Sequence, residues 1–156
     1  MALKRMAAVA ALCLLPAVAR AQIIRGTVVA AVGRTPIPNA AVAARVARTT
    51  ATADRLWAAL PLFSTAETWG DSLHFELPIE TGRERGARLN GELGEVYFWA
   101  DDDRILIAFG PTPISRPNEI RLPRPCNVLA RTQDDVRALK AVTPGEKVSV
   151  RRAGAT

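Results

Sequence analysis

Between Ile105 and Ser115 the chain reads Ile-Leu-Ile-Ala-Phe-Gly-Pro-Thr-Pro-Ile-Ser. The stretch begins as an apolar run typical of a β-strand and ends at two closely spaced prolines. Pro111 and Pro113 have no backbone N–H and a fixed φ, and each restricts the residue before it to extended conformations. Because such a segment cannot pair normally inside a sheet, the stretch predicts a strand followed by a stiff, extended loop. A loop of this kind either closes a barrel or shapes a binding groove.

The ordering by proline is expected to continue beyond this loop, because five of the eleven prolines lie between residues 111 and 125. Neither the loop nor the rest of the sequence offers a recognisable pairing of a nucleophile with a base. The pattern therefore indicates a fold more firmly than it indicates a reaction.

The segment that precedes Gln22 has the three-part layout of a secretory signal. Lys4 and Arg5 precede an apolar run over residues 6–15, and the pattern Ala19-Arg20-Ala21 predicts cleavage before Gln22. The run is shorter than the roughly 20 apolar residues that a membrane span requires. We expect a signal peptide over residues 1–21 and a product without a membrane span, exported to the periplasm or the medium. The alternatives are an N-terminal helix of the domain or a start codon assigned too early.

Removal of this leader changes the charge of the chain. The formal net charge of the whole sequence is +6, and loss of Lys4, Arg5 and Arg20 lowers it to +3. The remaining basic residues form no dense stripe, so the sequence does not support nucleic-acid binding. The three arginines within residues 83–88 alternate with glycine and glutamate, which is typical of a solvated loop.

Cys126 is the only thiol after residue 21. No internal disulfide can then form, so the stability of the exported protein must come from its core. A mature chain of about 135 residues is long enough for one domain. We place this domain at residues 22–152 and a C-terminal tail at residues 153–156.

Strand patterns dominate the mature chain. The predicted strands are residues 23–31, 41–46, 73–79, 96–99, 105–109, 128–130 and 148–150. Within residues 73–79, apolar residues alternate with His74 and Glu76, as expected for a half-buried strand. A turn is predicted over residues 33–38, and the acidic triplet at 101–103 predicts a hairpin.

Two helices interrupt the strands. The first is capped by Thr49 or Thr50, carries apolar residues at helical spacing and ends at Pro61. The second is capped by Thr132, with two aspartates in its first turn and Lys140 at its end, which matches the helix dipole. Many short strands with two helices at the ends predict a closed barrel rather than a sandwich.

Several motifs in fixed order resemble a known family. The most distinctive are Trp69-Gly70-Asp71 and Phe109-Gly110-Pro111-Thr112-Pro113, and the supporting segments are residues 53–61, 72–78, 91–99 and 126–131. In this order and spacing they resemble the cyclophilin-like domain family of small bacterial and archaeal proteins, from about residue 40 to residue 152. The resemblance implies a mainly β fold, a closed eight-stranded cyclophilin-like barrel. It implies no reaction, because the biochemical function of the family is not established.

Cyclophilins catalyse proline isomerisation with an arginine in a Phe-His-Arg strand, followed by a Gln-x-Gly-Asp segment. The nearest strings in this sequence are His74-Phe75-Glu76 and Trp69-Gly70-Asp71, and neither supplies that arginine. Glu76 is an acceptor where the twisted amide requires a donor. Nothing in the sequence directs another arginine towards a proline slot in place of the missing catalytic arginine. The candidates for that substitution are Arg104, Arg116, Arg121 and Arg131.

Other reactive residues favour structural interpretations. His74 is the only histidine, which excludes a metal site built from several histidines. The triplet Asp101–Asp103 is more typical of a hairpin turn facing water than of a cation site. Cys126 has no evident base or thiolate-stabilising neighbour and is expected to be a packed thiol. We predict no metal site and no cofactor.

The interpretation that follows is a non-catalytic module that binds a peptide segment or a small ligand beside residues 109–115. The candidate binding residues are Trp69, Asp71, Phe75, Tyr97, Phe109, Pro111, Thr112, Pro113 and Asn127. Three of these have a structural alternative, since Trp69 can cover a barrel end, Asp71 can stabilise a turn and Asn127 can bridge backbone groups of a loop. The competing function is a divergent peptidyl-prolyl isomerase acting on exported proteins, and another enzyme on the same fold is a third alternative.

Overall fold

The computed structural model describes residues 22–29, 36–46 and 50–153. The strands are β1 (Ile23–Val29), β2 (Pro36–Val46), β3 (Leu62–Thr65), β4 (Glu67–Thr68), β5 (Ser72–Glu76), β6 (Arg88–Gly91), β7 (Glu95–Trp99), β8 (Arg104–Ala108), β9 (Ile120–Thr132) and β10 (Lys147–Arg152). The helices are α1 (Ala51–Ala59) and the 3-10 helix η1 (Val136–Ala141). The predicted signal peptide over residues 1–21 and the first part of the predicted turn lie outside the described residues.

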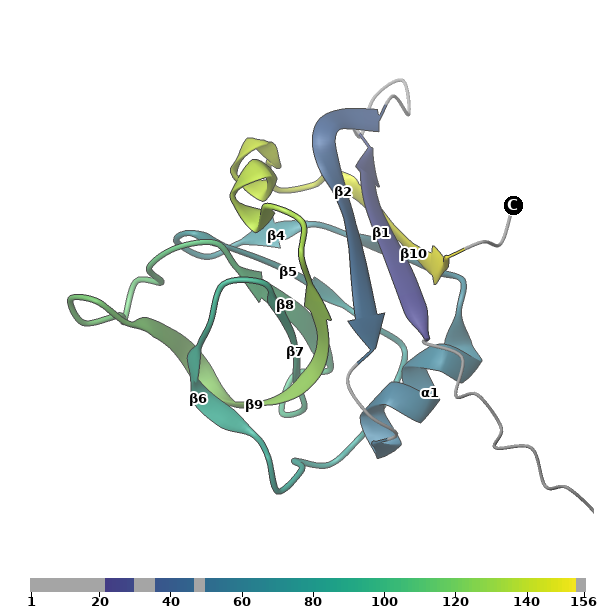
Figure 1. Ribbon diagram of the computed structural model, residues 1–156, viewed down its shortest axis with the longest axis horizontal. Helices are drawn as coiled ribbons and strands as arrows, with labels where there is room; N and C mark the ends of the chain where they lie inside the picture. The colour runs from purple at the N-terminus through teal and green to yellow at the C-terminus, as the bar shows by residue number, and fades with distance from the viewer. Residues whose placement is uncertain (1–21, 30–35, 47–49, 154–156) are drawn as a thin grey trace, which may run out of the picture.

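The strands form one curved antiparallel sheet in the order β3-β10-β1-β2-β9-β7-β8-β5-β4, with β6 paired to β9 (Figure 1). The prediction of a mainly β fold with two helices is confirmed. The prediction of a closed eight-stranded barrel is wrong, because no pairing joins the two end strands, β3 and β4. These strands are consecutive parts of one extended segment, separated only by Ala66. They follow each other end to end, whereas ladder pairing requires strands that lie side by side.

A side-chain hydrogen bond connects the segment that contains β3 and β4 to the end of β5. Ser64 in β3 donates a hydrogen bond from its hydroxyl to the carbonyl oxygen of Glu76 at the end of β5, at 2.7 Å. Ala66 is fully buried, and its backbone N–H donates to the carbonyl of Glu146 at 2.7 Å. The break in the sheet is therefore held by hydrogen bonds other than a strand pairing.

Apolar side chains pack on both faces of the β7–β8 hairpin. Val96 and Phe98 of β7 point into the main core, which lies inside the curved sheet. Tyr97, between them, belongs to a second cluster on the other face, together with Leu122 and Cys126 from β9. Because successive residues of a strand face opposite sides, this hairpin separates two packed cores.

Strand β9 is much longer than the predicted strand at residues 128–130. It spans 13 residues and contains Pro123 and Pro125. Its pairing with β6 is irregular, with Arg88 opposite Cys126 but Asn90 opposite Arg121. The prolines fall within that irregularity, where no regular ladder requires their missing N–H groups. The strand therefore extends through both prolines to Ile120.

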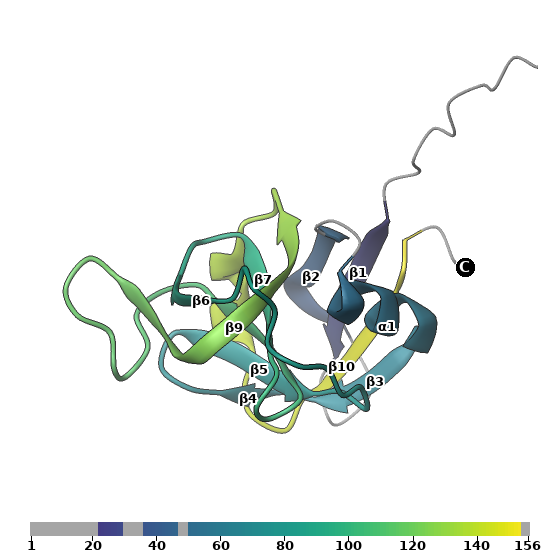
Figure 2. The same cartoon turned by 90° about the horizontal axis from the view of Figure 1, so that it is seen from below.

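The two helices lie on opposite sides of the molecule, η1 at the top and α1 at the bottom in Figure 1, so that α1 is at the front in the view from below (Figure 2). Helix α1 begins at the predicted cap, because the Thr50 hydroxyl accepts a hydrogen bond from the Ala53 N–H at 3.2 Å. The cap of η1 is Asp135 rather than the predicted Thr132. Thr132 ends β9 instead, and its hydroxyl donates to the Ala43 carbonyl at 2.6 Å. No helix among the described residues has the length and apolar character needed to cross a membrane.

The remaining predictions differ from the structure mainly in their ends. Hairpin β7–β8 and strand β10 lie where predicted. Strand β5 ends at Glu76, although Leu77 and Ile79 beyond it remain buried. Residues 36–38, predicted as part of a turn, begin strand β2.

Candidate ligand-binding cleft

The two most distinctive motifs of the sequence pack against each other. The Asp71 N–H donates to the Pro111 carbonyl, and the Phe109 N–H donates to the Asp71 carbonyl, each at 2.9 Å. A side chain on Gly70 would place its Cβ 2.7 Å from Pro113 Cδ, and one on Gly110 would place it 2.6 Å from an Asp71 carboxylate oxygen. Glycine is therefore required at both contacts, because any Cβ would overlap the facing segment.

The proline loop is also bonded to the start of β9. The buried Thr112 donates from its hydroxyl to the Arg121 carbonyl at 2.6 Å. The Ser115 hydroxyl accepts from the N–H groups of Thr112 and Arg121, each at 2.9 Å. Pro111 and Pro113 are exposed between these contacts. The loop is thus a rigid connection whose polar groups bond to its neighbours.

The candidate aromatic residues occupy different parts of the fold. Phe75 and Phe109 are buried in the main core, whereas Tyr97 is fully buried in the second cluster. Trp69 is half-buried beside the turn that its own motif forms. The structure brings Asp71 and the 109–113 loop together, but a ligand on the surface would not reach Phe75 or Tyr97.

Asn127 is fully buried and connects three segments of the chain. Its side-chain oxygen accepts from the Glu84 N–H at 2.8 Å. Its amide nitrogen donates to the Thr52 hydroxyl and to the Gly82 carbonyl, each at 3.0 Å. Its contacts thus match the bridging role that was one of the two interpretations of this residue. The segment it holds forms one edge of an open cleft.

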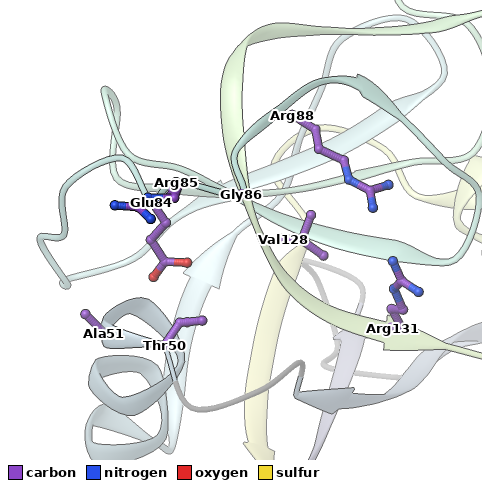
Figure 3. A pocket seen from close by; sticks show the side chains of 8 residues that line it. All are labelled: Thr50, Ala51, Glu84, Arg85, Gly86, Arg88, Val128 and Arg131. Carbon is purple, nitrogen blue, oxygen red and sulfur yellow. The ribbon is translucent and has the colours of Figure 1, made fainter.

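This cleft has a volume of about 920 Å³ and lies between α1, the loop before β6, and β9. It is lined by Thr50, Ala51, Glu84, Arg85, Gly86, Arg88, Val128 and Arg131 (Figure 3). The residues of the 109–115 loop are not among them. Figure 3 shows Glu84 directed towards the start of α1, and Arg88 and Arg131 extending towards each other on the other side of Val128.

Glu84 caps α1 from outside the helix. Its carboxylate accepts from the Thr52 N–H at 3.1 Å and from the Thr52 hydroxyl at 2.7 Å. A negative charge at this position is favourable, because the first N–H groups of a helix have no partner within it and carry partial positive charge. The contact fixes the loop of the cleft to the start of α1.

Glu95 is a nearly buried carboxylate at the start of β7, and it orders the opposite side of the cleft. Its side chain is 3% exposed and accepts from Arg131 at 2.6 Å and from Arg88 at 3.3 Å. The buried Tyr97 hydroxyl donates to the same carboxylate at 2.5 Å. Burial, together with this hydrogen bond, raises the pKa of Tyr97 far above its usual range. Tyr97 therefore remains a protonated donor that holds the carboxylate.

Two further cavities have a different chemistry. A second open cleft of about 740 Å³ is lined by Arg55, Ala58, Ala59, Glu76, Leu77, Pro78, Ile79, Glu80 and Asp103. A cavity of only about 30 Å³ lies in the apolar interior of the curved sheet, so the space among its lining side chains is nearly filled. Among the described residues, no group of three or more His, Cys, Asp or Glu side chains is placed to hold a metal ion.

The other reactive residues are held in structural contacts. Arg104 donates to Glu67 at 2.8 Å and lies 3.2 Å from His74 Nδ1. Burial and the charge of Arg104 lower the pKa of His74. Burial raises the pKa of the Cys126 thiol to about 12, which keeps it a neutral, packed thiol. Asp101 pairs with Arg83 at 3.1 Å.

No pattern in the sequence indicated the cleft as a site. Arg85 and Arg88 were interpreted as parts of a solvated loop, and Glu84, Glu95 and Val128 were not singled out. Alternation along β7 is the only local signal, because it places Glu95 and Tyr97 on one face of the strand. Nothing local predicts that Arg131 joins them, since that requires the pairing of β7 with β9.

Comparison with known proteins supports the fold. The sequence matches the family model described as Cyclophilin-like over residues 34–151. The structure is similar to the solution structure of the hypothetical protein AF2241 from Archaeoglobus fulgidus, with 29% identity, a TM-score of 0.67 and coverage of 86% of this chain and 98% of that chain. It is also similar in fold to McbB, solved in complex with tryptophan, with 20% identity, a TM-score of 0.60 and coverage of 85% of this chain and 45% of McbB. No curated protein matches the sequence.

Proposed function

Because this chain belongs to the cyclophilin-like family, we propose that it is a non-catalytic binding module whose ligand, a peptide segment or a small molecule, occupies the cleft between α1, residues 84–88 and β9. The observation that carries the proposal is the construction of this cleft. Its two sides are held in place by Glu84 and by Glu95, so it is formed before a ligand arrives. A preformed site loses less conformational entropy on binding.

The chemistry of the lining favours binding over catalysis. None of its eight residues is a serine, cysteine or histidine, and the Thr50 hydroxyl accepts the cap hydrogen bond of α1. The polar groups that remain are the guanidinium groups of three arginines and one carboxylate, and the apolar side chains of the lining are Ala51 and Val128. Convergent polar groups beside apolar side chains are typical of ligand sites.

The isomerase alternative receives no specific support from the arginines. Arg104 is paired with Glu67 and Asp102, and Arg131 is paired with Glu95. The Arg121 guanidinium lies 4.0 Å from the Glu119 carboxylate, and the side chain of Arg116 is exposed. A protease-coupled assay of proline isomerisation decides the alternative, because acceleration by micromolar protein would establish isomerase activity.

Gly86 provides a way to block the cleft. It lines the cleft and has no atom within 4 Å of an added Cβ, so Gly86→Trp is expected to fill the space without straining the backbone. Gly82 has equally open surroundings but does not line the cleft, so Gly82→Trp is the matched control. A thermal-shift screen of peptides and metabolites should find ligands of the wild type and of Gly82→Trp that Gly86→Trp no longer binds. Ligands that bind all three proteins equally would refute the assignment of the cleft.

We also propose that the module acts outside the cytoplasm, after cleavage before Gln22. The support is the layout of residues 1–21. Expression of the full chain in a bacterial host, followed by mass measurement of the periplasmic and secreted fractions, should show a product beginning at Gln22. An intact chain confined to the cytoplasm would contradict export.

A further inference from the structure

We infer that the cleft recognises a single carboxylate next to an apolar group, with Arg88 and Arg131 binding the carboxylate and Val128 contacting the apolar part. This inference deepens the proposed function and rests on it. It begins from the arrangement of the two arginines, which extend towards each other from β6 and β9 (Figure 3).

Both guanidinium groups are oriented by the same buried carboxylate. Arg131 contacts Glu95 through Nη2, and Arg88 contacts it through Nη1, which also bonds Glu92 at 2.9 Å. A guanidinium has five N–H donors in a planar fork. The side chains of Arg88 and Arg131 are 38% and 56% exposed, so part of each fork faces the solvent of the cleft.

The geometry of these donors suits a carboxylate. Arginine binds carboxylates through two parallel N–H···O bonds, and such a pair is strong when the guanidinium is already held in place. Glu95 holds both guanidinium groups in place by hydrogen bonds, and the Tyr97 hydroxyl holds the Glu95 carboxylate in place. Glu95 is thus a positioning residue, whereas the arginines would touch the ligand.

The local charge balance favours a monoanion over a phosphate. Three arginines of the cleft, at positions 85, 88 and 131, stand against three glutamates on or beside it, at positions 84, 92 and 95. A ligand with one negative charge can use the nearest arginines without strong repulsion from the glutamates. A dianionic phosphate would double both that repulsion and the attraction to the arginines. Its desolvation penalty, however, grows faster than its charge, and surroundings with as many glutamates as arginines do not offset that penalty.

The apolar side chains in the middle of the cleft indicate that part of the ligand is apolar. Val128 is half-buried there, between the arginine pair and the start of α1. Ala51 lies on the far side, at the first turn of the helix. Two sources provide a carboxylate next to an apolar group: the C-terminus of a peptide that ends in an apolar residue, and a free carboxylic acid.

The test compares four probes by chemical-shift changes and by calorimetry on the protein beginning at Gln22. They are a tetrapeptide acid ending in leucine, the same peptide with a C-terminal amide, 4-phenylbutyrate and inorganic phosphate. At least one carboxylate probe should bind at least tenfold more tightly than both the peptide amide and phosphate. Binding of the peptide acid alone identifies a peptide C-terminus, and binding of phenylbutyrate alone identifies a free acid.

Arg131→Lys separates this inference from the proposed function. Lysine keeps the charge that compensates Glu95 but lacks the planar fork, so the affinity for the carboxylate should fall at least tenfold. Arg137→Lys, at an exposed arginine of η1, should leave it unchanged. If Gly86→Trp abolishes binding but the amide binds as well as the acid, or Arg131→Lys has no effect, the inference is wrong and the proposed function stands. If no probe and no library compound binds in the cleft, both are wrong.

Discussion

Replacement of Gly70 by alanine should destabilise the fold strongly, for two reasons that can be separated. Gly70 has a φ of 59°, in the left-handed region, where a Cβ costs roughly 1–2 kcal/mol. The new Cβ would also lie 2.7 Å from Pro113 Cδ and 3.0 Å from the Pro111 carbonyl oxygen. These atoms belong to a backbone and a ring that cannot rotate away, and overpacking of this kind costs about 1–3 kcal/mol. We expect a loss of about 2–5 kcal/mol in the free energy of unfolding.

Three other glycines provide the controls. Gly145 has a φ of 94° and nothing within 4 Å of an added Cβ, so Gly145→Ala should show the backbone cost alone, about 1–2 kcal/mol. Gly110 shows the overlap without a positive φ, since its Cβ would lie 2.8 Å from the Asp71 Cβ; Gly110→Ala should cost about 1–3 kcal/mol. Gly82 has neither feature, so Gly82→Ala should change the stability by less than about 1 kcal/mol.

Urea unfolding followed by tryptophan fluorescence and circular dichroism measures these differences, provided that the m-value stays constant across the variants. Gly70→Ala should be the least stable of the four variants, because it alone combines a positive φ with the overlap. If it is no less stable than Gly145→Ala, the close packing of the Trp69-Gly70-Asp71 turn against the proline loop does not contribute to stability. The proline loop at residues 109–115 would then be available for contacts with a ligand.

Three further predictions concern buried polar groups of the protein that begins at Gln22. Asn127→Ala should lower the free energy of unfolding in urea by about 2–4 kcal/mol, because it leaves the buried partners of the amide unsatisfied; a loss under about 1 kcal/mol would contradict the bridging role. Cys126 should not react with a thiol reagent at pH 8 until urea unfolds the chain, because burial raises its pKa to about 12; rapid labelling of the native protein would show that the thiol is accessible. His74 should titrate below 6.5 by NMR, because burial and Arg104 lower its pKa. Near these pH values the unfolded chain then binds more protons than the folded chain, so the free energy of unfolding should fall as the pH decreases from about 6.5 through the folded pKa of His74. The variant His74→Gln should lack the contribution of His74 to this decrease. A measured pKa of 6.5 or above for His74 would refute the prediction.

Much of the secondary structure follows from short-range patterns. Thr50 and Pro61 bound α1 because a side-chain cap and a missing N–H act within one turn. The acidic triplet at residues 101–103 joins β7 to β8 because a tight hairpin depends only on its own turn and flanking strands. Predictions that rested on one or two neighbouring residues were the most accurate in position.

The less accurate predictions involve contacts between distant segments. The strand predicted at residues 128–130 begins at Ile120 instead, because the irregular pairing with β6 accommodates Pro123 and Pro125. The sheet was expected to close as a barrel, but no ladder joins its two end strands, β3 and β4. Both outcomes depend on which strands become neighbours, and no local pattern specifies this.

The amino-acid sequence alone determined the strand-rich class, the first helix and the resemblance to the cyclophilin-like family. Its two distinctive motifs proved to be partners in packing, since Asp71 exchanges backbone hydrogen bonds with the 109–111 segment. Only the tertiary structure decided where the proposed ligand cleft lies. The cleft joins Glu84, Arg88 and Arg131, and the last two converge on Glu95 because β9 pairs with both β6 and β7. Binding sites of this kind are set by strand pairing across the fold, whereas strands and caps are set by residues a few positions apart.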